Sequence, residues 1–89
     1  MVQVAFTPNL QRHVSCPPTV TDARSVREAL DHIFAVNPQL RFYIVDEQGR
    51  LRKHVNVYVN DRPVTDRIAL SDAVAPSDEI FVFQALSGG

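Results

Sequence analysis

A strictly alternating run at residues 54–60 restricts the fold of this chain more than any other feature. The valines of the run share one face of an extended strand, and the remaining residues share the other: Val55, Val57 and Val59 against Asn56, Tyr58 and Asn60. The valine face has to be buried, and 89 residues provide one domain with one hydrophobic core. We therefore expect a single domain in which residues 54–60 form a central strand.

Strand patterns also occur at both ends of the chain. Residues 2–6 alternate with their apolar side chains on one face. In residues 80–83, Ile80 and Val82 are expected to point inward, which places Phe81 and Phe83 on the opposite face. Residues 12–15 predict a further strand that 19–21 continue weakly, and Pro17-Pro18 confine it to a sheet edge.

One helix is clearly marked. Ser25 and Glu28 form a capping box, in which serine is the N-cap and glutamate occupies the third helical position. Apolar residues then recur every three or four positions, as on one face of a helix: Val26, Ala29, Leu30, Ile33 and Phe34. Asn37-Pro38 ends the pattern, because a residue before proline disfavours helical geometry. The pattern predicts a helix over 25–36.

Residues 39–54 allow two interpretations. One is a hairpin through Gly49 that pairs 42–45 with 51–54, and the other is a short helix at 39–44. Four of the nine basic residues fall here, at Arg41 and within 50–53, either on a solvated face or on a docking surface for an acidic partner. Further along, 60–63 predict a turn and 70–74 a single helical turn.

Composition excludes several classes of function. A net charge of −1 gives no excess of positive charge for binding nucleic acid, and no apolar run is long enough to span a membrane. The single cysteine, Cys16, cannot form an internal disulfide, and the N-terminus lacks the pattern of a secretion signal, so we expect a cytoplasmic protein. No paired-cysteine metal spacing, phosphate loop or nucleophile elbow occurs. A Cys16 pair with His13 or His54 is the weak alternative for catalysis.

Two glycines, Gly88 and Gly89, stand last in the sequence, and only Gly49 precedes them. Glycine lacks a Cβ atom, so such an end fits a slot too narrow for any side chain. The carboxylate of Gly89 is then the group that another enzyme could reach deep within a cleft. The simpler alternative is a terminus without function.

The order of elements, the strand and turn at 55–61, the Asp78-Glu79-Ile80 start of the last strand and the final 85–89 together resemble the ubiquitin-like β-grasp sulfur carriers. That family includes the small subunit of molybdopterin synthase and the carriers for thiazole and cysteine synthesis. The resemblance implies an α+β fold, a mixed sheet of four or five strands packed on one main helix. It implies a β-grasp domain at 1–83 and a flexible tail at 84–89.

The resemblance also implies a mechanism. In this family a ubiquitin-activating-like adenylyltransferase consumes ATP to adenylate the terminal carboxylate, here that of Gly89, and a sulfur donor converts it to a thiocarboxylate. The carrier itself has no active site and binds no metal or cofactor. Leu86, Ser87 and Gly88 would thread into the partner, over a six-residue tail of roughly 20 Å. Implied partners are the adenylyltransferase, a sulfur-accepting synthase and a metalloprotease that trims the product.

Docking is expected on the sheet face that the helix leaves open, through Tyr58, Phe81 and Phe83. The alternative is that these aromatic residues cover a second small core. Two other functions share the same residues: a covalent modifier attached to lysines of target proteins, and a non-catalytic interaction domain. The metabolite that receives the sulfur stays open, in part because Leu86-Ser87 replaces a valine-alanine pair that many carriers have.

Overall fold

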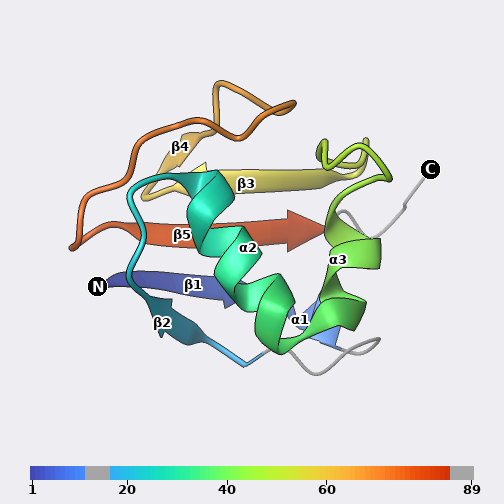
Figure 1. Ribbon diagram of the computed structural model, residues 1–89, viewed down its shortest axis with the longest axis horizontal. Coiled ribbons are helices and arrows are strands. Elements are labelled where there is room, and N and C mark those ends of the chain that lie inside the picture. Colours follow the sequence, from blue (N-terminus) through green and yellow to red (C-terminus); the bar gives the residue numbers. More distant parts are fainter. Residues whose placement is uncertain (12–16, 85–89) are drawn as a thin grey trace.

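A mixed sheet with one helix across its face organises the protein (Figure 1). The computed structural model describes residues 1–11 and 17–84. Within them the elements follow in the order β1 (Val2–Phe6), α1 (Pro8–Gln11), β2 (Thr19–Thr21), α2 (Val26–Val36), α3 (Pro38–Ile44), β3 (Val55–Val59), β4 (Arg62–Pro63) and β5 (Glu79–Gln84). The strand order is β2-β1-β5-β3-β4. The first and last strands, β1 and β5, pair in parallel at the centre, and the other pairs are antiparallel. This is the expected β-grasp arrangement.

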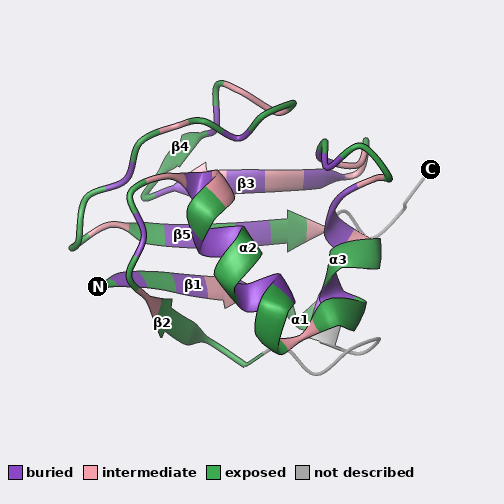
Figure 2. Cartoon of the chain, in the orientation of Figure 1, coloured by how far each residue is buried: buried purple, intermediate pink, exposed green. Residues whose placement is uncertain are grey.

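The strand patterns are confirmed, including their inward faces. Along β1, β3 and β5 buried residues alternate with more exposed ones (Figure 2). The inward side chains of these strands join one core: Val2, Val4, Phe6, Val55, Val57, Val59, Ile80 and Val82. β3 is an interior strand between β5 and β4, as predicted. β2 lies at the sheet edge as expected, while the strand predicted at 12–15 lies outside the described residues.

The predicted main helix is α2. The Glu28 backbone N–H donates to the Ser25 side-chain oxygen at 3.1 Å, so the serine caps the helix as expected. The predicted apolar face is buried against the sheet. The helix ends at Asn37, whose N–H donates to the Ile33 carbonyl at 2.8 Å, directly before Pro38.

Residues 38–44 form α3, so the helical interpretation of this segment is confirmed and the hairpin is wrong. Pro38 suits the first turn of a helix, and Leu40 and Ile44, four residues apart, are both buried. Of the predicted hairpin pairing, the structure contains an isolated antiparallel β-bridge between Val45 and Leu51. Between them the chain turns tightly at Gly49, where φ is +81°.

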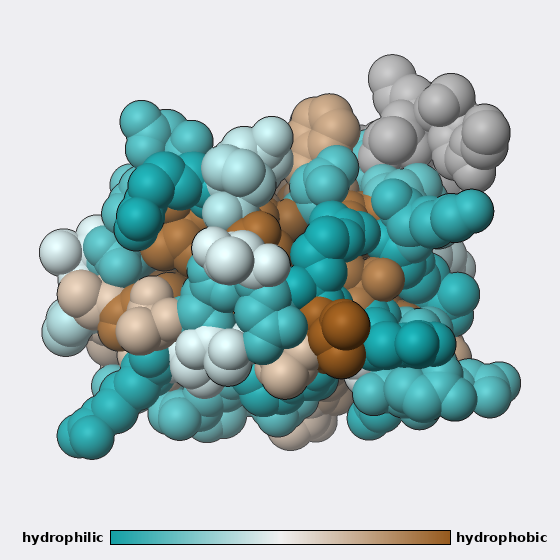
Figure 3. All heavy atoms as spheres, turned by 90° about the horizontal axis from the view of Figure 1, so that it is seen from above, coloured by the Kyte–Doolittle hydropathy of each residue, from teal (hydrophilic) through white to brown (hydrophobic). Residues whose placement is uncertain are grey.

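Residues 64–78 run as an irregular segment, and the helical turn predicted at 70–74 is wrong. Leu70 adopts a positive φ of 57°, which a helix does not allow. Carboxylates hold the backbone instead: Asp66 accepts the N–H groups of Ile68 and Ala69, at 3.0 and 2.9 Å, and Asp72 accepts that of Thr65 at 2.9 Å. The side of the molecule formed by β4 and this segment is mostly hydrophilic, with smaller apolar areas (Figure 3).

Candidate functional site

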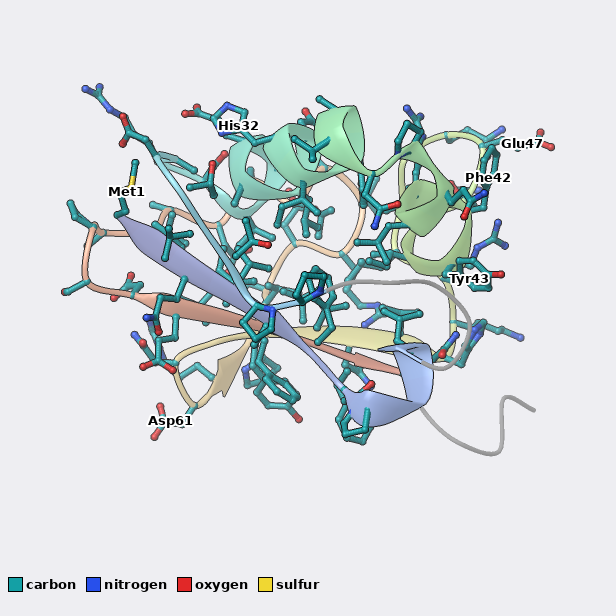
Figure 4. The ribbon with its side chains drawn as sticks, turned by 90° about the horizontal axis from the view of Figure 1, so that it is seen from below. Met1, His32, Phe42, Tyr43, Glu47 and Asp61 are labelled. Carbon is teal, nitrogen blue, oxygen red and sulfur yellow. The ribbon has the colours of Figure 1, made fainter. Side chains whose placement is uncertain are left out.

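The open face of the sheet carries a cluster of aromatic side chains, which we call the aromatic face: Tyr58, Phe81 and Phe83. The antiparallel register sets Tyr58 opposite Phe81 and Asn56 opposite Phe83. Phe81 and Phe83 are 38% and 43% exposed, and Tyr58 is half-buried. α2 and α3 lie on the other side of the sheet (Figure 4). The three side chains therefore remain accessible and do not form a second core.

The aromatic face borders a shallow depression of about 350 Å³, lined by Asn56, Tyr58, Asn60, Phe81 and Phe83. On the other side of β5, Ala5 of β1 stands opposite Phe81. This small residue leaves room for a second hollow of about 410 Å³, which Phe81 shares with β1 and β2. Phe81 thus lines both hollows and can be reached from either side.

A polar clamp fixes the end of the aromatic face at which β5 begins. The Asn60 side chain donates to Asp78 at 3.1 Å and accepts the Glu79 backbone N–H at 3.1 Å. The Ala75 N–H also donates to Asp78, at 2.8 Å, and together with the Asn60 bond this lowers the pKa of Asp78. The clamp keeps the start of β5 in register with the end of β3.

At its other end, β5 is held from both sides up to Gln84. Val55 of β3 is the register partner of Gln84. From β1, the Thr7 N–H donates to the Val82 carbonyl at 3.1 Å, and the Thr7 hydroxyl oxygen accepts the Gln84 N–H at 3.4 Å. Thr7 itself is buried. The sheet therefore fixes the point from which the chain continues toward Gly89. Leu86, Ser87, Gly88 and Gly89 lie outside the described residues.

The arginine at position 67 braces the same end of the sheet, and sequence patterns gave no sign of it. Its guanidinium donates to the backbone carbonyls of Arg52 and Val55, at 2.8 and 2.7 Å, and to the side-chain oxygen of Asn56 at 3.0 Å. Asn56 is itself on the open face. Arg67 thus ties the irregular segment 64–78 to the first residues of β3.

The sequence of this chain matches a known protein family. The model of the ThiS family matches residues 14–89, most of the chain and its Gly-Gly end. The chain belongs to the ThiS family. Small archaeal modifier protein 1 of Haloferax volcanii is 34% identical over 65 residues, which cover 73% of this chain and 70% of that protein.

Solved structures confirm the ubiquitin-like β-grasp fold. The crystal structure of SAMP1 from Haloferax volcanii superposes with a TM-score of 0.77 at 26% identity, covering 99% of this chain and 98% of that one. A chain of the Amycolatopsis orientalis BexX/CysO complex gives a TM-score of 0.83 at 25% identity, with both chains fully covered. The protein is thus similar throughout its length to ubiquitin-like carriers and modifiers.

Of the residues considered for catalysis, His54 is half-buried and stands one residue before β3. Cys16 and His13 lie outside the described residues, and the ring of His32 bonds the Thr21 hydroxyl at 2.7 Å. Among residues 1–11 and 17–84, no three His, Cys, Asp or Glu side chains stand close enough to hold a metal ion. No helix in this part of the chain has the length and apolar character to cross a membrane.

Proposed function

We propose that this ThiS-family protein is a sulfur carrier whose Gly89 carboxylate cycles to a thiocarboxylate. A ubiquitin-activating-like adenylyltransferase joins the carboxylate to AMP from ATP and releases pyrophosphate. A sulfur donor then displaces AMP and leaves the thiocarboxylate. A biosynthetic synthase, of the cysteine or molybdopterin type, accepts the sulfur, and a metalloprotease trims the product where that product stays attached. The site of action is the cytoplasm, consistent with one cysteine and no disulfide.

The observation that carries this proposal is the construction of β5. One strand presents Phe81 and Phe83 on the open face and ends at Gln84, where both neighbouring strands hold it. Five residues follow Gln84 in the sequence and reach roughly 17 Å when extended, at ~3.3–3.6 Å each. A partner docked on the aromatic face can therefore receive Gly89 in a site well beyond the globular body.

The chemistry needs such a partner. A terminal carboxylate has a pKa of about 3.3–3.7, so it is ionised at neutral pH and is a poor electrophile. Adenylation bonds one carboxylate oxygen to the phosphorus of AMP, so that AMP can leave when a nucleophile attacks the carbonyl carbon. Gly88 and Gly89 let the backbone enter a narrow slot, because neither carries a Cβ atom. The carrier contributes the reacting group and its placement, and the partner contributes the catalytic side chains.

The aromatic face supports docking by its composition as well as its position. Aromatic residues are enriched in the centres of protein interfaces, where they contribute most of the binding energy. Polar residues surround the face, among them Asn56 and Asn60. A complex that contains CysO, with a chain similar to this protein along its full length, supports a partner enzyme for this chain as well.

A second function, covalent modification of proteins, is favoured by the 34% identity to small archaeal modifier protein 1. The first step is the same adenylation. A lysine amine of a target protein then attacks the activated carbonyl, an amide bond forms and AMP leaves. The choice between the two functions depends on which nucleophile the cell presents to the activated Gly89.

Intact mass spectrometry tests both functions. With ATP, the adenylyltransferase and a sulfur donor, the protein should gain the mass difference between one sulfur and one oxygen atom. Deletion of Gly89, or Gly88→Phe, should abolish adenylation and this gain while the thermal unfolding temperature stays unchanged. Cys16→Ser is the matched control and should be activated normally.

Normal activation of the Gly89 deletion would contradict both functions. Adenylation without the sulfur-bearing species, together with conjugates on target lysines, would establish the modifier and reject the carrier. If neither adenylation nor conjugates form in the presence of a competent adenylyltransferase, the protein is an interaction domain.

A further inference from the structure

Several cationic residues belong to elements that meet at the end of the sheet where β5 finishes. We call three of them, Arg41, Arg52 and Lys53, the basic collar. Arg41 lies on α3, and the other two directly precede β3. Arg41 and Lys53 are exposed, and Arg52 is half-buried. The collar is part of the basic run visible in the sequence. Arg52 has a structural role through its hydrogen bonds, but the proposed chemistry uses none of the three charges.

The backbone places the collar beside the origin of the tail. The first residue of β3, Val55, is the register partner of Gln84, so Lys53 and Arg52 stand just before that pair. The Val55 N–H donates to the Arg52 carbonyl at 3.0 Å, and Arg67 binds the same carbonyl at 2.8 Å. These contacts make the location of the collar a fixed property of the fold.

The collar is also joined to α3. The Arg52 side chain donates to the Phe42 carbonyl at 2.7 Å, and its backbone N–H donates to the Ile44 carbonyl at 3.1 Å. Phe42 stands beside it with 70% of its surface exposed, the most exposed aromatic side chain among the described residues. Phe42, Tyr43 and Glu47 lie at the same end of the molecule (Figure 4).

Nearby carboxylates leave the collar with a surplus of positive charge. Asp46 is occupied by Arg50, at 3.0 Å, and Asp31 of α2 faces Arg27 at 3.9 Å, although it also borders a hollow with Arg41. Glu47 is the other acidic residue of this loop. The end that carries the collar is hydrophilic where Figure 3 shows it, at the right of that view.

The opposite end of the sheet carries several acidic side chains. Asp61 lies at the tip of the β3–β4 hairpin, at the far end of the molecule from Phe42 in Figure 4. Asp78 and Glu79 are joined to the same hairpin through Asn60. Arg62 follows Asp61 in the same hairpin and offsets part of this negative charge, in a protein whose net charge is −1.

We propose that the basic collar docks on an acidic surface of the partner protein, around the opening through which the tail enters. This inference rests on the proposed function, because it names the chemistry of the partner that receives Gly89. The aromatic face supplies apolar contact, and the collar orients the carrier so that its tail end approaches first. Complementary charge of this kind raises association rates and fixes orientation more than it adds final affinity.

A protein fits the collar better than a nucleic acid does. Three cations with Glu47 beside them neutralise few phosphates, and a binding site for a polyanion needs a longer basic stripe. Exposed Phe42, whose carbonyl binds Arg52, offers an apolar contact that suits a folded protein surface.

The test compares two double variants of equal charge. Arg41→Gln with Lys53→Gln removes the two exposed collar charges and spares Arg52, whose hydrogen bonds are structural. Arg24→Gln with Arg62→Gln removes two exposed charges elsewhere. Stopped-flow mixing with the adenylyltransferase, without ATP, gives the association rate constant over a series of salt concentrations, and pyrophosphate exchange gives kcat and KM.

At about 0.01 M salt we expect the collar variant to associate roughly three- to tenfold more slowly than the wild type, with a raised KM and an unchanged kcat. At about 1 M salt, where the Debye length is ~3 Å, the difference should vanish. The control variant should match the wild type within about twofold under both conditions.

Equal association rate constants for the collar and control variants at low salt would contradict the inference about the collar. If the wild type is adenylated normally in the same experiments, the proposed function is unaffected. If the wild type is not adenylated, both the proposed function and the inference about the collar are wrong. If total tRNA, added to ¹⁵N-labelled protein, shifts the Arg41 and Lys53 amide signals while the adenylyltransferase does not, the collar serves a nucleic acid and the inference is wrong.

Discussion

At the scale of single residues, polar side chains that stabilise irregular backbone determine where the strands stop and start. Asp66 is the clearest case. Its carboxylate accepts the Ser71 hydroxyl at 2.6 Å and the backbone N–H of Ala69 at 2.9 Å. These bonds, with that of Ile68, lower the pKa of Asp66 from 3.8 to about 2. The ionised Asp66 therefore helps to hold the segment between β4 and β5, together with Asp72 and Asp78.

This role of Asp66 predicts a specific response to acid. Because the folded-state pKa of Asp66 lies below the unfolded value, its contribution to stability is present above about pH 4 and is lost as the pH falls toward 2. Asp66→Asn should lower the unfolding temperature at pH 7, and the difference from the wild type should shrink between pH 4 and 2. Thermal unfolding, monitored by circular dichroism from pH 7 to pH 2, measures this difference in unfolding temperature.

Ser71→Ala is the companion variant, because it keeps the carboxylate and removes its hydroxyl donor. Its unfolding temperature should fall below that of the wild type by less than that of Asp66→Asn does, and this difference should shrink over the same pH range. Parallel pH curves for wild type and Asp66→Asn would show that the ionised form of this carboxylate does not stabilise the fold.

At the scale of elements, sequence patterns predicted what depends on periodicity. The two-residue period of β1, β3 and β5 and the capping box of α2 gave their positions and inward faces, because burial imposes that period. The same period placed Tyr58, Phe81 and Phe83 on the open face. For 39–54 the sequence left two interpretations, since Phe42 and Tyr43 favour strands whereas Pro38, Leu40 and Ile44 suit a helix.

Contacts between distant residues could not be predicted from periodicity. The Asn60–Asp78 clamp and the Arg67 brace join residues 18 and 11 or more positions apart, and nothing local marks them. α1 was not predicted, because its four residues are too few for a periodic pattern, although proline suits a first helical turn. The basic run was visible in the sequence, but its location beside Gln84 depends on the register of β3 and β5.

The two faces of β5 give a prediction for this strand. Phe83→Thr removes an exposed aromatic side chain and introduces a β-branched residue that suits a strand, so it should weaken binding to the adenylyltransferase by about 5- to 30-fold with a small change in unfolding temperature. Val82→Ala is the neighbouring control. It opens the core and should cost about 2 kcal/mol of stability while the folded protein binds normally.

Calorimetric titration and thermal unfolding separate these two effects. A Phe83→Thr variant that binds like the wild type would exclude Phe83 from the interface. A loss of stability as large as that of Val82→Ala would instead show that Phe83 belongs to the hydrophobic core.

At the scale of the whole molecule, the proposed function assigns binding and reaction to different parts of the chain. The aromatic face and the basic collar are built on strands and on α3, held by the hydrogen bonds at Thr7, Arg67 and Asn60. The proposed reacting group, Gly89, follows the sheet by five residues. Because the proposed docking surfaces are separate from the reacting carboxyl group, successive partners can each bind the same protein and reach Gly89. This holds whether a sulfur donor or a lysine attacks the adenylate.

This separation predicts a competitive inhibitor. A protein with one alanine appended after Gly89 keeps both docking surfaces, but its carboxylate is displaced and the added Cβ atom collides with a slot shaped for glycine. It should not be adenylated, yet it should inhibit adenylation of the wild type with an inhibition constant within about threefold of the wild-type KM. The same extension combined with Phe83→Thr should inhibit at least fivefold more weakly, because it also loses an anchor of the docking surface. Steady-state pyrophosphate exchange with mixed carriers measures both constants. An extended protein that does not inhibit would mean that binding energy comes from the Gly-Gly end itself, and the aromatic face would then have no part in recognition.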